Sequence, residues 1–395
     1  MSGIPTFFIF GVARSGTNLV ARMLDANPHS TVALDPLLPL FRAWRNQVVD
    51  QSRPLLKHPW NPQSSLQDYY FAEDGAVLLR AVLEADPTLS LTAGTLANLL
   101  PSVMDRAALE SPVLAEAFSK WSGGTWKELL DSAMTLIANT AIKSGKQIKA
   151  AGVKEVWTIE FVRALAKALP DARFIVLHRD PRGVMASQMA MAKKDPTQAA
   201  HSISYMRHWR KHVTLARMFN ADDALKDRIL QVRYEDILKA PAYWAEKLAA
   251  FVGLEFEPAM LHPGKEQGWE SNSSFTSARS EVDAQAAERW REKLPAHVIA
   301  VVEFHCGIEM RSLGYELIRP NPGELDAAVL RGIEESHASP GKWRSDSGDQ
   351  DNDLAWECLR WQIAACETAS IPQTLSERCF LAPVPHADHQ NSKNQ

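Results

Sequence analysis

The sequence has little of what marks disulfide-rich, membrane-spanning or nucleic-acid-binding proteins. It contains only four cysteines in 395 residues, and no two of them form a C-x-x-C pair. This argues against a disulfide scaffold and a cysteine zinc site. No apolar run approaches the roughly 18 residues of a membrane-spanning helix. The formal net charge of −4 gives no basic excess for binding nucleic acid. A globular protein with reduced thiols fits best.

The amino-terminal residues also lack a secretion signal. M-S-G-I-P-T has no basic run ahead of an apolar segment. We therefore expect a cytoplasmic protein with no membrane span. With 46% hydrophobic residues, a chain of this length has ample material for a packed core. No pattern predicts an oligomeric state.

Short apolar runs alternate with longer amphipathic stretches along much of the chain. Strands are predicted at 6–10, 31–34, 151–153, 173–177 and 228–232, and helices at 17–26, 159–169, 182–191, 203–219 and 243–251. Strands that alternate with helices favour a parallel sheet covered on both faces. We therefore predict an α/β fold of three layers with a central parallel sheet.

Two regions depart from this alternation. Residues at about 45–145 show helical periodicity without a strong strand, and their tryptophans suit either an acceptor-binding lid or a packed core. A Pro/Gly-rich linker begins at residue 319, and the Ser/Gly/Asp-rich stretch 336–353 predicts disorder before a helix at 354–368. We divide the chain into a 1–318 domain with a helical insertion and a partly disordered 319–395 extension.

A glycine-bounded turn joins the first predicted strand to the first predicted helix, in F-I-F-G-V-A-R-S-G-T-N. Gly11 and Gly16 have the spacing of a P-loop, whose backbone amides cradle a phosphate at a helix N-terminus. Thr17 stands where a nucleotide triphosphatase carries lysine. Arg14 and Ser15 instead place a guanidinium and a hydroxyl inside the loop. This loop suits a donor with one compact 5′-phosphate that bears a transferable anion, such as a sulfated phosphate.

A second candidate anion site follows another strand, in R-F-I-V-L-H-R-D-P-R-G-V-M-A-S. Arg179 ends the strand, and Ser187 lies eight residues later in the next helix. A guanidinium and a hydroxyl at these places can converge on one dianion. Taken alone, the R-D-P-R segment also fits an ordinary salt-bridged loop.

The two segments together resemble those of sulfotransferases that use 3′-phosphoadenosine 5′-phosphosulfate (PAPS), in particular the tyrosylprotein and carbohydrate branch. The resemblance covers roughly residues 5–43 and 150–315. It implies PAPS as co-substrate, without a metal. The donor contacts that it implies are Arg14, Ser15, Gly16, Thr17, Asn18, Arg179 and Ser187.

Three weaker matches add further donor contacts. Tyr234, in V-R-Y-E-D-I-L, follows the last predicted strand and matches a tyrosine-acid segment of the family, although it also suits a core cap. Ser274, in N-S-S-F, and Arg289, beside a tryptophan, have the family's spacing for closing over the donor. Ordinary loop and surface-helix roles are the alternative for both.

In-line sulfuryl transfer requires a base for the acceptor hydroxyl and cations for the leaving phosphate. Asp35, in T-V-A-L-D-P, matches the family's catalytic carboxylate, although glutamate is usual there and Pro36 follows directly. An Asp-Pro turn is the alternative, and His29 is the second choice of base. Lys154, after the strand A-A-G-V, matches the family's catalytic lysine. Lys154 and Arg14 are the leaving-group candidates.

We therefore expect a sulfotransferase that moves a sulfuryl group from PAPS to a hydroxyl of a small molecule, glycan or peptide. A P-loop kinase or nucleotide triphosphatase is the alternative, in which Glu155 and Asp180 would hold magnesium; a non-catalytic nucleotide-binding scaffold is another. His208 and His212 have zinc-like spacing, but H-W-R-K-H favours histidines on a solvated helix face.

Overall fold

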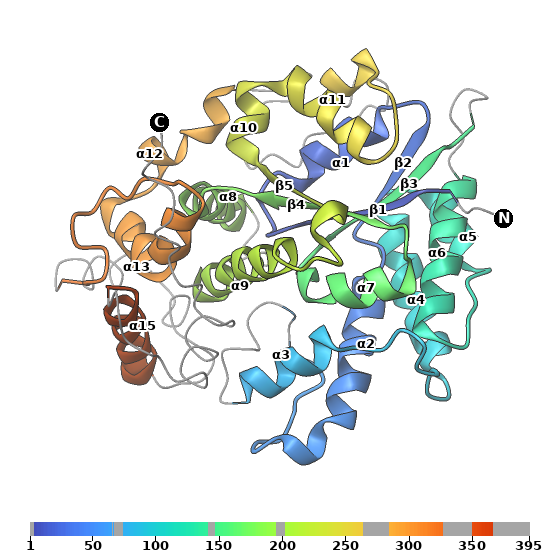
Figure 1. Ribbon diagram of the computed structural model, residues 1–395, viewed down its shortest axis with the longest axis horizontal. Coiled ribbons are helices and arrows are strands. Elements are labelled where there is room, and N and C mark those ends of the chain that lie inside the picture. Colours follow the sequence, from blue (N-terminus) through green and yellow to red (C-terminus); the bar gives the residue numbers. More distant parts are fainter. Residues whose placement is uncertain are drawn as a thin grey trace.

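A single parallel sheet forms the centre of the protein (Figure 1). The computed structural model describes residues 4–64, 66, 74–140, 147–194, 202–263, 284–326 and 350–365. The sheet has the order β2-β3-β1-β4-β5, with every neighbouring pair parallel. The strands are β1 Thr6–Gly11, β2 Ser30–Leu34, β3 Ala150–Val156, β4 Arg173–His178 and β5 Ile229–Arg233. The predicted α/β class with a central parallel sheet is confirmed.

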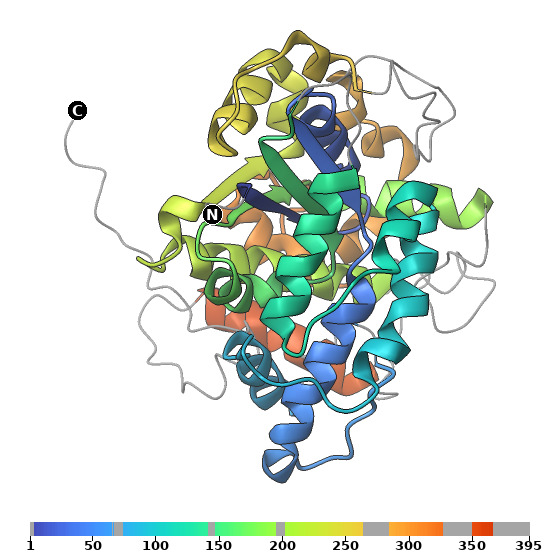
Figure 2. The same ribbon diagram turned by 90° about the vertical axis from the view of Figure 1, so that its right-hand side faces the viewer.

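Side chains of β1 alternate between two separate apolar cores. Phe8 and Phe10 pack into one core, and Phe7 and Ile9 into the other. Helices α1 and α11 cover the Phe7 face, and α2, α6 and α7 cover the Phe8 face (Figures 1 and 2). Their bounds are α1 Thr17–Asp25, α2 Leu38–Gln51, α6 Trp126–Thr140, α7 Val162–Ala168 and α11 Pro241–Phe251. A continuous apolar strand is thus explained by burial on both faces.

The block between β2 and β3 is helical, as its periodicity predicts. Besides α2 and α6 it holds α3 Gly75–Leu83, α4 Thr95–Ala108 and α5 Pro112–Phe118, and its described residues include no strand. Trp44, Trp121 and Trp126 are buried, and the rings of Trp44 and Trp126 stack with their centroids 5.7 Å apart. The sequence left the tryptophans open to either an acceptor-binding lid or a packed core, and these three lie in the core.

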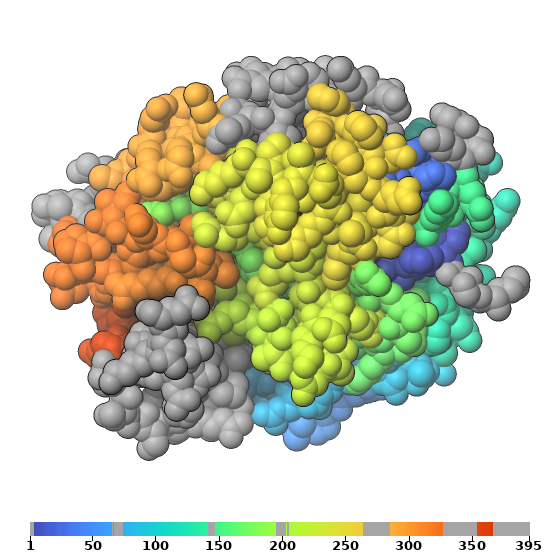
Figure 3. Space-filling model, turned by 45° about the horizontal axis from the view of Figure 1, so that its top comes forward, coloured from blue at the N-terminus to red at the C-terminus, as the bar shows by residue number. Residues whose placement is uncertain are grey.

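Apart from α11, the α-helices after β4 form a second group beside the sheet. They are α8 Pro181–Lys194, α9 Ser202–Asn220, α10 Tyr234–Lys239, α12 Trp290–Lys293, α13 Ala296–Ser312 and α15 Gln350–Ala365. Figure 3 shows the orange and red carboxyl-terminal segments gathered on one side of the molecule. None of the helices in the described ranges is long and apolar enough to cross a membrane.

The last described helix, α15, docks against α13. Trp361 Nε1–H donates to Phe304 O at 2.9 Å, and a Cβ on Gly307 would lie 2.9 Å from the Trp361 ring. Glycine is therefore required where α13 meets this ring. The helix begins four residues earlier than predicted, at Gln350. Residues 327–349 and 366–395 lie outside the described residues, and the proposed domain boundary stays a prediction.

The expectation for the paired histidines of α9 is wrong. His208 and His212 are both buried rather than solvated. Helix α9 packs between the sheet and α13, so nearly all of its faces are covered. His212 Nε2 donates to Leu177 O at 3.1 Å, and neighbouring Lys211 pairs with buried Glu160 at 3.1 Å. These polar groups have partners inside the protein.

Candidate active site

The loop between β1 and α1 presents backbone amides at a helix N-terminus. Ser15 N–H donates to Val12 O at 3.0 Å, which closes the turn. Gly16 has a φ of 94°, and a Cβ there would lie 2.4 Å from the Tyr234 ring. The N-cap residue of α1 is Gly16, which has no side chain to occupy the amides of the first turn. The loop therefore keeps the features that an anion site needs.

The candidate donor residues meet across the sheet. Arg14 Nε–H donates to Ser187 Oγ at 3.0 Å, and Arg179 Nη1–H donates to Arg14 O at 2.7 Å. The Arg179 guanidinium lies 4.5 Å from the centre of the Tyr234 ring. Residues from the ends of β1, β4 and β5 are thus assembled into one cluster with Ser187 of α8.

Two polar atoms of this cluster are buried without a hydrogen-bond partner in the described part of the chain. They are Ser15 Oγ and Arg179 Nε. Buried polar atoms are nearly always paired, so unpaired donors here indicate a ligand. Burial lowers the pKa of Arg14, and the positive charge of Arg179 lowers it further, although Tyr205 opposes this shift. An anion would relieve the repulsion between the two guanidinium groups.

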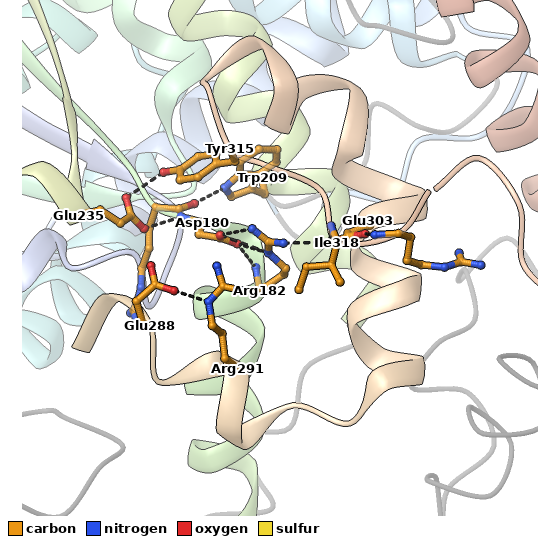
Figure 4. Close-up of polar contacts among 11 residues, drawn as sticks. Asp180, Arg182, Trp209, Glu235, Glu288, Arg291, Glu303, Tyr315 and Ile318 are labelled. Atoms are coloured by element: carbon orange, nitrogen blue, oxygen red, sulfur yellow. Dashed lines mark hydrogen bonds and ion pairs between the residues drawn. The ribbon is translucent and has the colours of Figure 1, made fainter. Parts of the chain in front are cut away.

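The R-D-P-R segment also contains the salt bridge that a plain loop would have (Figure 4). Arg182 pairs with Asp180 at 2.6 Å and with Glu303 at 2.9 Å, and its guanidinium lies 4.0 Å from the centre of the Trp290 ring. All four residues are buried. The two arginines of the segment are therefore divided between two tasks, since Arg182 is held in the core and Arg179 faces the loop.

Further hydrogen bonds fix the backbone around Arg179. Trp209 Nε1–H donates to Arg179 O at 2.8 Å, and Asp180 N–H donates to Glu235 Oε1 at 2.9 Å. Tyr315 donates its hydroxyl hydrogen to the other oxygen of Glu235 at 2.9 Å (Figure 4). Helices α9 and α10 and the chain after α13 thus hold the loop that carries Arg179.

Asp35 and Lys154 form an ion pair on the other side of β1. Lys154 Nζ contacts Asp35 Oδ2, and Val156 N–H donates to Asp35 Oδ1 at 3.3 Å. Asp35 N–H donates to Lys154 O at 2.7 Å. Strand β3 runs on to Val156, so Lys154 lies inside the strand rather than after it. The predicted end at Val153 is wrong because Lys154 and Glu155, although charged, are buried among partners.

Backbone strain gathers at this edge of the sheet. In the described part of the chain, the non-glycine residues with positive φ are Arg14, Asp35 and Trp157, at 73°, 51° and 73°. Asp35 directly follows β2, Trp157 directly follows β3, and Arg14 lies in the loop after β1. Such conformations persist where neighbouring contacts enforce them, and they cluster at functional sites.

The structure does not place all the remaining predicted site residues beside the loop that follows β1. His29 precedes β2 at the opposite edge of the sheet and contacts Gln147 O at 2.9 Å, so it is wrong as the second-choice base. Arg289 is half-buried at the start of α12, and its part in donor binding stays a prediction. Ser274 lies outside the described residues.

The acids proposed for magnesium are engaged elsewhere. Glu155 is fully buried and accepts a hydrogen bond from Leu37 N–H at 2.5 Å. Asp180 is paired with Arg182. Across the described ranges, no group of three or more His, Cys, Asp or Glu residues is arranged to hold a metal ion.

Sequence reasoning missed two side chains at the site. Tyr205, on α9, is close enough to Arg14 for each to shift the other's pKa, and burial raises the pKa of Tyr205 to about 12. Arg106, on α4, donates from Nε to Asp35 O at 2.6 Å. Neither lies in a segment with a recognisable pattern, because each reaches the site only through helix packing.

Comparison with known proteins agrees with this geometry. Residues 5–258 match the model of the family described as "Sulfotransferase family". Protein-tyrosine sulfotransferase 1 of Danio rerio is 26% identical over 285 residues, which cover 68% of this chain and 77% of that protein. Carbohydrate sulfotransferase 3 of Homo sapiens is 27% identical over 207 residues, which cover 48% of this chain and 41% of that protein.

Among solved structures, the "Sulfotransferase Domain from the Curacin Biosynthetic Pathway" superposes with a TM-score of 0.46 at 16% identity. The superposition covers 80% of this chain and 99% of that domain, and it is too loose to transfer any detail of the site. The family match over more than half of the chain carries the assignment. The protein is an enzyme of the sulfotransferase family.

Proposed function

We propose that this enzyme uses PAPS as its sulfuryl donor and transfers the group to a hydroxyl of a small molecule, glycan or peptide. The observation that carries the proposal is the pair of guanidinium groups, Arg14 and Arg179, assembled with Ser187. Two buried atoms beside them, Ser15 Oγ and Arg179 Nε, have no hydrogen-bond partner among the described residues. A nucleotide with anionic groups at both its 5′ and 3′ positions fits such a cluster.

The donor contacts divide between the two ends of that nucleotide. The 5′-phosphosulfate lies on the loop and the N-terminus of α1, held by Arg14, Ser15, Gly16, Thr17 and Asn18. Arg179 and Ser187 take the 3′-phosphate, and Tyr234 packs beside Arg179. Ser274 and Arg289 close over the donor in this proposal.

The reaction is an in-line displacement at sulfur. The acceptor oxygen forms a bond to sulfur while the bond between sulfur and the bridging phosphate oxygen breaks, and the hydroxyl proton passes to Asp35. Positioning and neutralisation of charge supply most of the rate in such transfers. Arg14 and Lys154 stabilise the negative charge that gathers on the leaving phosphate.

The ion pair between Lys154 and Asp35 gives these two roles a common timing. Before the reaction the lysine ammonium is balanced by the Asp35 carboxylate. When Asp35 accepts the proton its charge is lost, and the ammonium is left unbalanced as the bridging oxygen becomes negative. The Lys154 ammonium therefore becomes available to stabilise the bridging oxygen as the negative charge develops there.

Asp35→Asn tests the base. The amide cannot accept the hydroxyl proton, so we expect kcat to fall about 100-fold or more while donor affinity stays within about threefold. Turnover with radiolabelled PAPS across an acceptor library, and calorimetric titration of 3′,5′-adenosine bisphosphate, measure the two quantities. Retained activity across the pH range would assign the base elsewhere, and binding of ATP without the bisphosphate would overturn the donor.

Lys154→Ala tests the leaving-group role. Loss of one transition-state donor typically lowers turnover at least about 100-fold, and we expect this loss at saturating donor. Single-turnover kinetics separate the chemical step from product release. A near-normal rate would show that Lys154 only balances Asp35.

A further inference from the structure

The turn that carries Asp35 is held from two sides, by Arg106 and by Glu155. Arg106 Nε–H donates to Asp35 O at 2.6 Å, and Glu155 Oε1 accepts from Leu37 N–H at 2.5 Å. Arg106 comes from α4 in the helical insertion, and Glu155 comes from β3. The two contacts therefore enclose the turn Asp35–Leu37 between the insertion and the sheet.

The backbone of this turn is strained. Asp35 has a φ of 51°, in the left-handed region that residues other than glycine rarely adopt. Pro36 follows, and proline restricts the residue before it and supplies no amide hydrogen. The turn therefore depends on hydrogen bonds made by its neighbours at Asp35 O and Leu37 N.

Glu155 is suited to this task as a neutral acid. Its side chain is fully buried, and Oε2 has no hydrogen-bond partner in the described part of the chain. Burial raises the pKa of Glu155 well above its usual range, and the negative charge of Asp35 raises it further. A protonated Glu155 still accepts from Leu37 N–H through its carbonyl oxygen, and it places no second negative charge beside Asp35.

We propose that Arg106 and Glu155 are positioning residues that hold Asp35 in the turn from which its carboxylate meets Lys154 and Val156 N–H. The proposal rests on the proposed role of Asp35 as base. Because Arg106 belongs to α4, the insertion contributes to the alignment of the base as well as to the core.

Arg106→Ala is the first test. We expect kcat to fall about 10- to 100-fold with the KM for PAPS within about threefold, because the base is misplaced while the donor loop is untouched. Guanidinium ion added to the assay restores part of the rate. Lysine at this position does not restore it, because a single ammonium lacks the geometry of the guanidinium.

A matched control lies four residues after Arg106 in the chain. Glu110 pairs with Arg22 of α1 at 3.0 Å and joins the same region of the insertion to the domain without contacting the Asp35 turn. We expect Glu110→Gln to keep kcat close to that of the wild type. An equal loss in Glu110→Gln and Arg106→Ala would overturn the proposal, because general docking of the insertion would then explain both.

Glu155 is tested by a pair of variants. Glu155→Ala removes the acceptor for Leu37 N–H, and we expect a fall in kcat of about tenfold or more. Glu155→Gln, which is neutral and retains a carbonyl oxygen, restores the turnover lost in the alanine variant. A folded glutamine variant as inactive as the alanine variant would overturn the neutral-acid role; thermal unfolding of each variant verifies folding.

A double variant separates positioning from a general effect on the structure. A residue that acts only through the Asp35 carboxylate has nothing left to align in Asp35→Asn, so Asp35→Asn/Arg106→Ala should be no slower than Asp35→Asn. If the two losses multiply in the double variant, the positioning role of Arg106 would be overturned. Full activity of Asp35→Asn would overturn the proposed role of Asp35 as base. An inactive Asp35→Asn, with normal activity in Arg106→Ala and Glu155→Ala, would overturn only the positioning roles of Arg106 and Glu155.

Discussion

Arg179 and Arg182 show how two identical side chains, three residues apart, acquire different work from their surroundings. Arg182 lies between two carboxylates and a tryptophan ring, so its charge is balanced within the protein. Arg179 contacts a backbone carbonyl and an aromatic ring, and its Nε has no partner in the described ranges. Charge balance therefore distinguishes Arg179, the proposed donor contact, from Arg182, which supports the loop.

Alanine at each position should give opposite results. Arg179→Ala should weaken binding of 3′,5′-adenosine bisphosphate by about 10-fold or more with little change in thermal stability, because a charge-assisted contact is lost. Arg182→Ala should destabilise the protein by about 3–5 kcal/mol, because Asp180 and Glu303 stay buried without their cation. Calorimetry and denaturant unfolding measure the two effects. An equal loss of stability in Arg179→Ala and Arg182→Ala would refute the different roles assigned to the two arginines.

Residues beside a strand end are the ones that the sequence makes predictable. Arg14, Asp35 and Arg179 each follow an apolar run, and parallel strands bring their carboxyl ends to one edge of the sheet. Tyr205 and Arg106 were missed because they reach that edge from helix interiors. Their positions depend on how α9 and α4 pack, and no local pattern records this.

At the scale of elements, β4 and α9 are joined through two buried histidines. The rings of His178 and His212 lie 5.2 Å apart, and His178 Nε2 is 2.8 Å from Gln231 Oε1. Burial lowers the pKa of His178 to about 4, although the Gln231 contact opposes the shift. Burial also lowers the pKa of His212 well below its usual value, and His178 adds to this. Both rings are neutral in the folded protein at neutral pH.

This pair predicts a loss of stability in mild acid. An unfolded histidine binds its proton near pH 6.5 and folded His178 only near pH 4, so the unfolded state takes up more protons between these values. The free energy of unfolding keeps the full contribution of His178 above pH 6.5 and loses about 3 kcal/mol of it as the pH falls to 4. Denaturant unfolding at several pH values measures it. His178→Gln should flatten the slope, whereas His262→Gln, at an exposed position, should leave it unchanged.

Apolar periodicity located the five strands and most of the longer helices, but it missed α2, α5 and α10, and it failed where charged residues are buried. The pattern ended β3 at Val153 because Lys154 and Glu155 look like surface residues, yet ion pairing and a raised pKa let both lie inside. For the same reason α9 looked partly solvated, since Lys211 and His212 are buried with partners. Hydrophobicity read along a chain contains no information about such partners.

Across the whole molecule, buried ion pairs attach α15 to the rest of the protein. Glu357 contacts Arg210 of α9 at 2.6 Å and Arg360 at 2.6 Å. Arg360 also pairs with Glu309 of α13 at 2.5 Å. Although burial alone would raise the pKa of Glu357, Arg210 and Arg360 hold it well below its usual range. Helix α15 thus supplies a buried carboxylate to Arg210 of α9.

Removing that carboxylate should destabilise the domain rather than only release the helix. Glu357→Gln leaves the guanidinium groups of Arg210 and Arg360 buried with less compensating charge, so we expect a loss of about 3–5 kcal/mol in the free energy of unfolding. Asp223→Asn breaks an exposed pair with Lys226 and should have no measurable effect. A glutamine variant as stable as the wild type would show that α15 is dispensable to the domain.

The common direction of the five strands has a practical consequence for anyone who immobilises this enzyme. The chain enters β1 at Thr6, and the reactive groups gather where β1, β2 and β3 end. Six residues of strand span about 20 Å. A tether joined ahead of Thr6 would therefore attach to the end of the sheet opposite the proposed catalytic residues, and would leave their end of the sheet facing the solution that carries the acceptor.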